Sequence, residues 1–185
     1  MNLSNNLKHH FLVAMPQLND SYFGHSVCYI CDHNEHGTMG LVINKPMGIS
    51  LGDIFSELHI EDTNQSTRSI LQGGPVSPEQ GFVLYQGGYN EVQNTEITNT
   101  VRLSTSKEIL SNIASGTGPD DVLVCLGYAG WDAGQLEEEI AENTWLTVEA
   151  DEELLFHTPV ADIAQKAAQK IGVDINLLTT QSGHA

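Results

Sequence analysis

The order of the predicted elements indicates a single α+β domain with a largely antiparallel, barrel-like sheet. Two β-rich runs, Ser26–Asp32 and Thr38–Asn44, flank the segment HNEHG, a pattern typical of a β-hairpin. Later in the chain, the β-favouring run Val122–Leu126 precedes apolar residues at helical spacing. Hairpins followed by alternating helices and strands are characteristic of the α+β class, in which the sheet is mostly antiparallel.

The length and composition fit one globular domain. The chain has 185 residues, of which 40% are hydrophobic and 17% are charged. A chain of this length can bury roughly two thirds of the surface that it exposes when unfolded. We assign residues 8–180 to the domain and expect the polar segments 1–7 and 181–185 to be flexible tails.

The first half of the chain is predicted to be rich in strands. His10–Met15 reads as a strand that Pro16 ends. The segment Leu51–Leu58 carries apolar residues at i, i+3, i+4 and i+7, which predicts an amphipathic helix opened by Ser50. Short strands are also expected at Ile70–Leu71, at Gly81–Gln86 after the rigid connection QGGPVSPEQ, and at Val101–Leu103, with surface loops at 59–67 and 87–100.

Two further helices are predicted from their end signals. Thr105 and Glu108 fit the capping box of a helix that ends at Gly116. The last helix is expected to begin at Thr158–Pro159, with threonine as the N-cap and proline in the first position, and to end at Gly172. Both helices have one apolar side, so we expect each to cover the sheet.

The predicted centre of the fold is the buried strand Val122–Leu126. We expect it to stop at a glycine-rich turn, Gly127–Gly134, because closely spaced glycines let the backbone turn tightly. An acidic helix follows, with Leu136 and Ile140 on its buried side. Thr144–Glu149 is then predicted to be another strand.

The charge balance argues against binding to nucleic acid. Seven Lys and Arg residues stand against 24 Asp and Glu residues, which gives a net charge of −17. The sequence has no basic cluster that could neutralise backbone phosphates. We therefore expect a protein or small-molecule partner and no direct contact with DNA or RNA.

The cysteines and the N-terminal region indicate a cytoplasmic protein. Cys28, Cys31 and Cys125 lie in apolar runs, and an odd number of cysteines fits reduced thiols better than a disulfide framework. The early apolar run Phe11–Met15 is too short for a secretory signal or a membrane-spanning helix. We therefore expect neither export nor insertion into a membrane.

Four residues that can bind metals lie close together in the sequence. Cys28, Cys31, His33 and His36 have a spacing that would allow a zinc site. If their segment is a strand, however, Cys28 and Cys31 point to opposite faces and cannot share one ion. We therefore favour buried cysteines and surface histidines, and we predict no metal ion and no cofactor.

Two glycine-containing motifs have both a functional and a structural interpretation. Gly48–Gly52 matches the nucleophile-elbow pattern G-x-S-x-G, but Ser50 followed by Asp53 also fits a helix cap. The glycines of Gly127–Gly134 could form a phosphate loop, although their spacing fits no nucleotide-binding motif and Glu137–Glu139 would repel phosphate. We favour the structural interpretation of both motifs and assign no catalytic residue.

Three stretches of the chain form a recognisable set. They are HFLVAMP with SVCYICDHNEHGTMGLVINKP (within residues 10–46), LQGGPVSPEQGFVLY (71–85) and GYAGWDAGQLEEEIAENTWL (127–146). Together they resemble the YqgE/AlgH family of largely uncharacterised bacterial proteins. The resemblance implies a cytosolic α+β protein with a pseudo-barrel sheet and flanking helices, and an indirect role in transcriptional regulation. It implies little chemistry.

The chain departs from the family pattern at three places. Gln80 stands where an arginine commonly precedes GF, and Tyr85 stands where a histidine commonly follows VL. Asp132–Ala133 replaces a frequent Gly-Pro pair. An activity that used that arginine or histidine is therefore not implied for this chain.

Two turns could together line a ligand pocket, because binding residues often lie on loops that a rigid scaffold holds. The corner at Gly74 and Pro75 and the turn around Trp131 predict such a pocket, with Tyr85, Trp131 and Gln135 in its wall. The alternative is that Trp131 belongs to the core, since aromatic side chains dominate core burial.

Two hypotheses about function follow from the sequence. We expect a non-enzymatic regulatory or ligand- and partner-binding protein, because the chain is acidic and shows no assembled set of catalytic residues. The alternative is a small enzyme whose pocket lies near the GGPV and GYAGW turns. A convergent polar cluster in one cleft would favour the enzyme.

Overall fold

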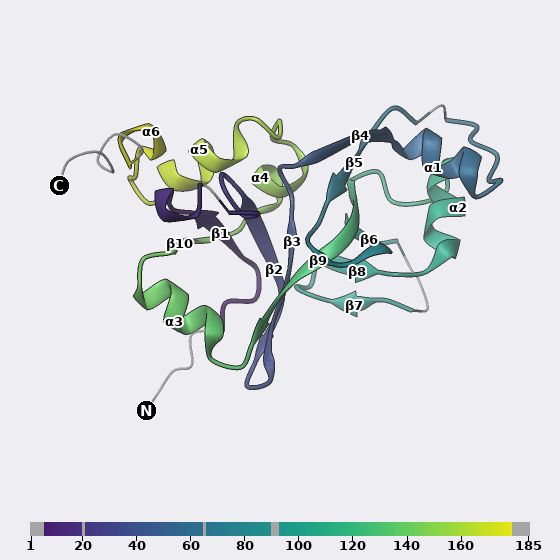
Figure 1. The fold of residues 1–185 in the computed structure, drawn as a ribbon. Coiled ribbons are helices and arrows are strands. Elements are labelled where there is room, and N and C mark those ends of the chain that lie inside the picture. Colours follow the sequence, from purple (N-terminus) through teal and green to yellow (C-terminus); the bar gives the residue numbers. More distant parts are fainter. Residues whose placement is uncertain (1–5, 20, 65, 90–92, 179–185) are drawn as a thin grey trace. The chain divides into compact units, whose positions relative to one another are not determined.

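Close contacts group the residues of the computed structural model into two units (Figure 1). The structure describes residues 6–19, 21–64, 66–89 and 93–178. The first unit contains the described residues of 1–44 and 129–185, and the second contains those of 45–128. Residues 1–5 and 181–185 of the predicted tails, and residues 65 and 90–92 of the predicted loops, lie outside the described part.

The first unit is built around antiparallel strands. Its elements are β1 (His10–Ala14), the 3-10 helix η1 (Pro16–Leu18), β2 (Val27–Asn34), β3 (Gly37–Val42), the end of β9 (Val122–Asp132), α3 (Gln135–Ala141), β10 (Trp145–Glu149), α4 (Glu152–Phe156), α5 (Ile163–Gln169) and α6 (Ile175–Leu178). The strands lie in the order β10, β1, β2, β3, β9. Each neighbouring pair is antiparallel.

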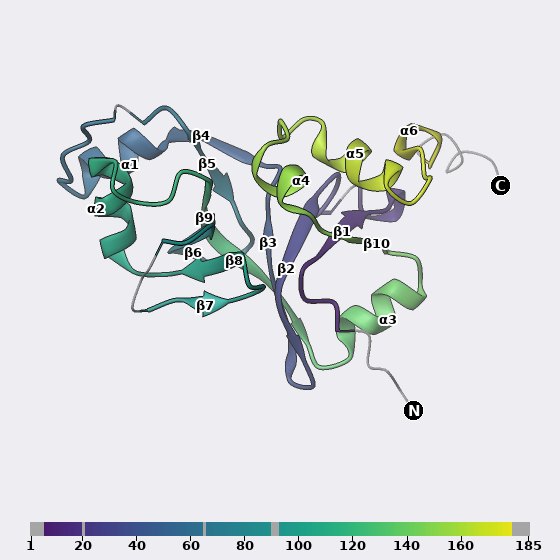
Figure 2. The ribbon, with the colours of Figure 1, turned by 180° about the vertical axis from the view of Figure 1, so that it is seen from behind.

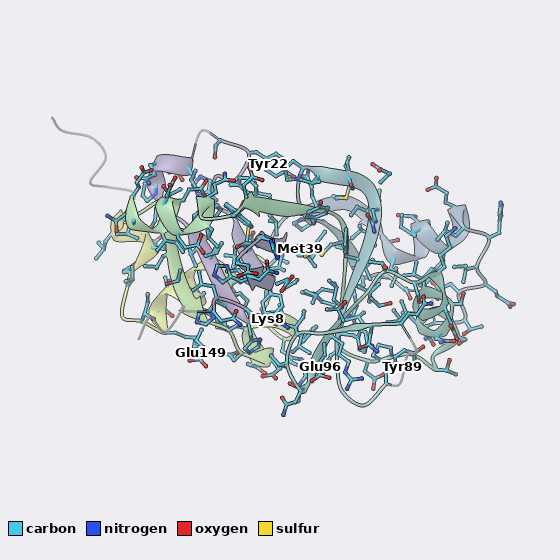
Figure 3. The ribbon with its side chains drawn as sticks, turned by 90° about the horizontal axis from the view of Figure 1, so that it is seen from below. Lys8, Tyr22, Met39, Tyr89, Glu96 and Glu149 are labelled. Carbon is cyan, nitrogen blue, oxygen red and sulfur yellow. The ribbon has the colours of Figure 1, made fainter. Side chains whose placement is uncertain are left out.

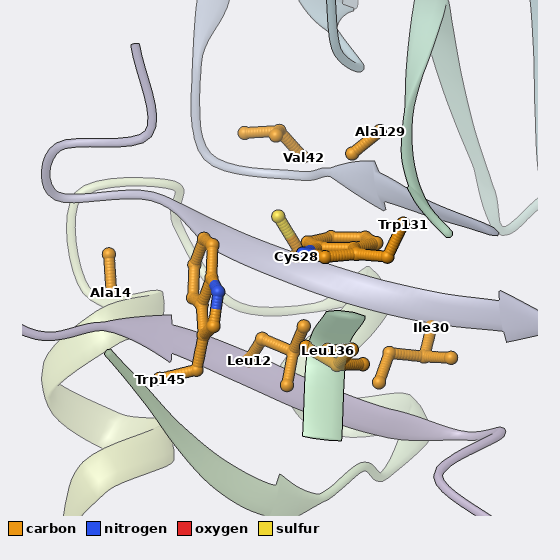
Figure 4. Close-up of a cluster of buried hydrophobic side chains, with 9 residues drawn as sticks. All are labelled: Leu12, Ala14, Cys28, Ile30, Val42, Ala129, Trp131, Leu136 and Trp145. Atoms are coloured by element: carbon orange, nitrogen blue, oxygen red, sulfur yellow. The ribbon is translucent and has the colours of Figure 1, made fainter. Parts of the chain in front are cut away.

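Alternating residues of β1 and β2 pack against different helices. Leu12, Cys28 and Ile30 share a buried cluster with Leu136 of α3 (Figure 4). Phe11 is also fully buried, but it points to the other face because successive side chains of a strand alternate. α5 contacts β1 and β10, and it lies on the side of these strands opposite to α3 (Figure 1). The sheet of the first unit is therefore covered on both faces.

The second unit is a mixed sheet with two helices. Its elements are β4 (Pro46–Ser50), α1 (Leu51–Glu57), β5 (Ser69–Gln72), β6 (Val76–Gln86), β7 (Thr95–Glu96), β8 (Val101–Ser104), α2 (Lys107–Ser115) and the first part of β9. β9 is antiparallel to β6 and parallel to β5. β6 also pairs with β8, which in turn pairs with β7, and β5 also pairs with β4. Figure 2 shows α1 and α2 side by side.

Several predicted elements are present with their end signals. The hairpin forms as β2 and β3, and the helix predicted at Leu51–Leu58 is α1. The Ser50 hydroxyl accepts a hydrogen bond from the Asp53 N–H at 3.1 Å, and the Asp53 carboxylate accepts one from the Ser50 N–H at 2.8 Å. This capping box confirms the structural interpretation of Ser50.

The predicted stop at Gly127 is wrong, because β9 continues to Asp132. Gly127 has φ of 75°, and a Cβ atom there would lie 2.3 Å from the carbonyl oxygen of Gly74. Glycine alone adopts this conformation without steric cost and leaves room for the carbonyl. Beyond it the strand alternates, with Ala129 and Trp131 buried. Residues 127–132 therefore belong to a strand, and only Ala133 and Gly134 form the turn before α3.

Two predicted helix starts are also wrong. The N-cap of α2 is Ser106, whose hydroxyl accepts from the Ile109 N–H at 3.4 Å, and Thr105 lies outside the helix. The last helix, predicted to begin at Thr158–Pro159, is α5, which begins only after Asp162, and the short helix α4 before it is missing from the prediction. The predicted start lies in the turn between them. α4 is too short to show a helical period in the sequence.

Three strand segments are missing from the sequence prediction, and the shortest is β7, which lies within the loop predicted at 87–100. β4 begins at Pro46, where the sequence predicts only the end of the preceding strand. Proline is tolerated here because β4 pairs only with β5 among the described strands and so lies at an edge. β6 begins at Val76, inside the predicted connection, with an irregular register between Val76 and Gly81.

Gly127→Ala should destabilise the protein far more than Gly134→Ala. Both glycines have positive φ, but a Cβ at Gly134 would meet no atom within 4 Å. Gly134→Ala should therefore cost about 1 to 2 kcal/mol of unfolding free energy for the left-handed backbone alone. Gly127→Ala should cost at least about 2 kcal/mol more, measured by urea denaturation. Equal losses would contradict the steric account.

Candidate functional site

The second unit contains a cavity of about 530 Å³ between α1 and α2, which we call the α1–α2 pocket. The two helices lie side by side in both ribbon views. This volume is within the range of small-molecule binding sites. The apolar lining consists of Ile54, Leu58, Val83, Leu110, Val124 and Leu126.

Two adjacent sides of α1 have different surroundings: one packs in the core, and the other lines the α1–α2 pocket. Leu51 and Phe55 are almost fully buried and belong to the core cluster of the second unit. Ile54 and Leu58 lie four residues apart, so they share a neighbouring side of the helix. They line the pocket, and Leu58 is 41% exposed. The helix thus has more apolar surface than its core contact uses.

The floor of the pocket is formed by β6 and β9. Val83 pairs with Val124, and Gly81 pairs with Leu126. Gly81 and Val83 lie two residues apart in the strand, so they face the same side of the sheet. A Cβ atom added to Gly81 would meet no atom within 4 Å. The pocket is therefore open above Gly81, and a larger side chain there would enter it.

Polar groups surround the apolar floor. They are Glu57, Glu79, Gln80, Thr105, Ser106 and Lys107. Glu57, Glu79 and Lys107 are exposed. An arrangement with an apolar interior and a polar rim can bind a molecule with an apolar body and one polar end.

The first unit contains a second candidate, a carboxylate held by aromatic residues. Trp131 and Trp145 each donate an indole N–H to the Oε2 atom of Glu139 at 2.9 Å. Gln135 donates to the Oε1 atom of Glu139 at 3.1 Å. The two indole rings meet edge to face with centroids 6.0 Å apart (Figure 4). Both carboxylate oxygens are engaged within the protein, so the cluster ties α3 to the sheet.

A hydroxyl, an imidazole and a carboxylate also form a chain in the first unit. The Nδ1 atom of His33 lies 2.7 Å from the Thr38 hydroxyl, and its Nε2 atom lies 3.2 Å from Glu137. These groups have the order of a nucleophile, a base and an orienting acid. Thr38, however, is only 7% exposed, whereas the Glu137 side chain is 51% exposed. A buried hydroxyl cannot reach a substrate, so the chain joins the hairpin to α3.

A buried tyrosine and a half-buried histidine form a pair near the start of β1. The Tyr29 hydroxyl lies 2.8 Å from the Nδ1 atom of His9. Burial raises the pKa of Tyr29, so its hydroxyl stays protonated. Burial also lowers the pKa of His9 below its ordinary value of 6.5, although the Glu152 carboxylate opposes this shift. The folded protein therefore favours neutral His9.

The predicted pocket residue Tyr85 belongs to the buried cluster of the second unit. Its ring contacts Tyr89 edge to face, with centroids 5.8 Å apart. The Tyr89 hydroxyl, labelled in Figure 3, accepts a hydrogen bond from the Asn112 amide. Tyr85 is fully buried and lines none of the α1–α2 pocket.

The other predicted pocket residues lie in two different units. Gly74 is buried and Pro75 is exposed at the corner before β6 in the second unit. Trp131 and Gln135 belong to the Glu139 cluster of the first unit. None of them lines the α1–α2 pocket. A ligand pocket walled by these residues and Tyr85 stays a prediction.

The cysteines and histidines considered for zinc are held separately. All three cysteines are buried thiols, and burial raises the pKa of Cys125 to about 12. His33 contacts Thr38 and Glu137, whereas the His36 side chain is 86% exposed. Within the described part of the chain, no group of three or more His, Cys, Asp or Glu residues is arranged to hold a metal ion.

The α1–α2 pocket is not among the sites predicted from the sequence. One available signal is the apolar pattern of Leu51–Leu58, which assigns Ile54 and Leu58 to the same buried side as Leu51 and Phe55. Four apolar residues are more than a helix of two turns needs to pack one side against a core, so part of this apolar surface was available for another contact. The opposing wall, on α2 and β6, could not be inferred, because it requires knowledge of which elements meet.

Glu139→Gln should lower the unfolding free energy by about 1 to 2 kcal/mol. The glutamine amide would offer the two buried indole N–H groups one neutral oxygen in place of a carboxylate. Hydrogen bonds to a neutral acceptor are weaker than those to a charged one, so the folded state loses stability. Urea denaturation measures the change. The matched control, Glu138→Gln, removes a charge from the next, exposed position and should stay within about 0.5 kcal/mol of the parent. Similar losses in both variants would refute this role of Glu139.

His9→Asn should reduce the loss of stability on acidification. Because the pKa of His9 is lower in the folded than in the unfolded state, its contribution to stability is full above about pH 6.5, the unfolded-state pKa, and is lost as the pH falls from there through the lower folded-state pKa. Asparagine tolerates the positive φ of 60° found at His9. Thermal unfolding between pH 8 and pH 5.5 tests this, with the exposed His36→Gln as a control that should retain the parent slope. An unchanged slope in His9→Asn would contradict the assignment.

None of the helices in the described part of the chain has the length and hydropathy that crossing a membrane requires.

The AlgH-like family (DUF179) matches residues 11–176. A UPF0301 protein from Saccharophagus degradans is 48% identical, over 97% of this chain and 89% of its own length. Another, from Pectobacterium carotovorum, is 44% identical over 97% of this chain and 100% of its own.

The solved structures include a protein similar to this chain over its whole length. The solution structure of AlgH from Pseudomonas aeruginosa has a TM-score of 0.81 and 43% sequence identity, and the match covers 100% of this chain and 99% of that one. This similarity confirms the predicted α+β class with a mostly antiparallel sheet and flanking helices. The family resemblance inferred from the three sequence stretches is likewise confirmed: the chain belongs to the AlgH-like family of bacterial proteins.

Proposed function

We propose that the protein is a non-enzymatic binding protein that takes up an apolar small molecule in the α1–α2 pocket. The observation that carries this proposal is the cavity of about 530 Å³, which has an apolar lining and a polar rim. Small-molecule sites have this size and composition. Displacing water from apolar walls stabilises a complex by about 25 cal/mol for each Å² of apolar surface buried.

Three side chains that could perform catalysis are buried or hold structural contacts, which favours binding over an enzymatic reaction. Ser50 caps α1, and Thr38 is buried beside His33. Cys125 is buried, and its raised pKa keeps the thiol protonated and unreactive. The α1–α2 pocket itself is lined by no histidine or cysteine.

We further propose that binding serves regulation in the cytoplasm, through a protein partner. The three cysteines, all present as buried thiols, support a reducing compartment. The net charge of −17 opposes contact with the phosphates of nucleic acids, so an effect on transcription would be indirect. A ligand that changes the surface around α1 and α2 could then change the affinity for the partner.

Binding of the neutral dye N-phenyl-1-naphthylamine tests the proposal. The dye should gain fluorescence when the protein is added, and Gly81→Phe should lower its affinity about tenfold because the new ring enters the pocket. The melting temperature of Gly81→Phe should be equal to or higher than that of the parent, since glycine weakens a strand. Loss of binding would then not reflect loss of folding.

Gly81→Ala is the matched control for this experiment. Its small side chain should leave most of the cavity open and change the affinity less than about threefold. Affinity should therefore decrease with the size of the side chain at this position. Dye binding that is unaffected by Gly81→Phe would place the dye elsewhere and overturn the proposed site, and the absence of any dye binding would overturn the proposed function.

A further inference from the structure

Two carboxylates lie at the rim of the α1–α2 pocket. Glu57 is the last residue of α1, and Glu79 lies in β6. Both line the pocket and are exposed. Among the described residues, neither has an ion-pair or side-chain hydrogen-bond partner. Their negative charges are therefore available to a group that enters the pocket.

The rim of the pocket also carries one positive charge, the ammonium group of Lys107. Lys107, the first residue of α2, also lines the pocket and has no ion-pair partner among the described residues. The adjacent Glu108 is exposed in the same helical turn. The rim thus carries two negative charges and one positive charge, on a chain whose net charge is −17. The resulting potential attracts a cation and repels an anion.

We propose that the ligand of the α1–α2 pocket is a small amphiphile with an apolar body and a basic amino head group. This inference rests on the proposed function, since it names the class of molecule that the same pocket takes. The apolar body contacts Ile54, Val83 and Leu110, and the ammonium head lies at the rim near Glu57 and Glu79. The cavity of about 530 Å³ suits a small molecule.

Competition with the bound neutral dye tests the charge of the head group. Decylamine, decanol and decanoate share one chain length and are cationic, neutral and anionic at pH 7. Decylamine should displace the dye at about a fivefold lower concentration than decanol, and decanoate should be the weakest. Salt at about 0.5 M should reduce the difference, because both carboxylates are exposed and screened by ions.

Two double variants separate the rim from the overall charge of the protein. Glu57→Gln with Glu79→Gln removes the rim carboxylates, whereas Glu61→Gln with Glu108→Gln removes two exposed carboxylates that do not line the pocket. Both changes alter the net charge equally. The preference for decylamine over decanol should fall to less than about twofold in the first and stay near fivefold in the second.

The outcomes distinguish this inference from the proposed function. A preference for decylamine that the rim variant removes and the control variant keeps supports the basic head group. Equal displacement by decylamine and decanol, a preference for decanoate, or equal effects of the two double variants would overturn the head-group inference and leave the pocket intact. Failure of all three compounds to displace the dye would overturn the inference and count against the proposed function as well.

Discussion

The close approach of the Gly74 carbonyl to Gly127 is the constraint on which the course of β9 depends. A Cβ atom at residue 127 would lie 2.3 Å from that oxygen, and the backbone there has positive φ. Glycine removes both obstacles, so the strand continues. β9 therefore supplies residues 122–128 to the sheet of the second unit and residues 129–132 to that of the first.

In the first unit, the continuation of β9 determines which hydrogen bonds the buried polar groups form. Alternation along the strand places Trp131 in the core, where its indole shares the Glu139 carboxylate with Trp145. His33 is similarly occupied by Thr38 and Glu137. Buried polar groups whose hydrogen bonds are satisfied within the protein stabilise one arrangement of the fold. His33, considered from the sequence as a zinc ligand, thereby takes part in the architecture of the fold.

The second unit differs because its helices are short. α1 buries Leu51 and Phe55, and α2 buries Ile109. Ile54 and Leu110, on neighbouring sides of these helices, are only partly buried against the core and line the pocket. Leu58, which follows α1, is 41% exposed. The α1–α2 pocket of about 530 Å³ opens to solvent at its exposed polar rim. A bound apolar molecule would cover its apolar lining.

Local interactions made several elements predictable from the sequence alone. The hairpin of β2 and β3, the capping box at Ser50 and the end of α2 at Gly116 depend on residues that are near one another in the chain. The family was also recognisable, since its motifs are short and ordered. The cap of α2 was misplaced by one residue, because Thr105 and Ser106 have similar preferences for that position.

What the sequence by itself determined is therefore the α+β class, the family and the elements whose ends are set by neighbouring residues. The path of β9 through Gly127 and the α1–α2 pocket were decided only by the tertiary structure. A glycine between apolar residues can end a strand or let it pass a carbonyl, and the choice depends on Gly74, far away in the sequence. A cavity likewise depends on side chains from separate elements that only the folded chain brings together.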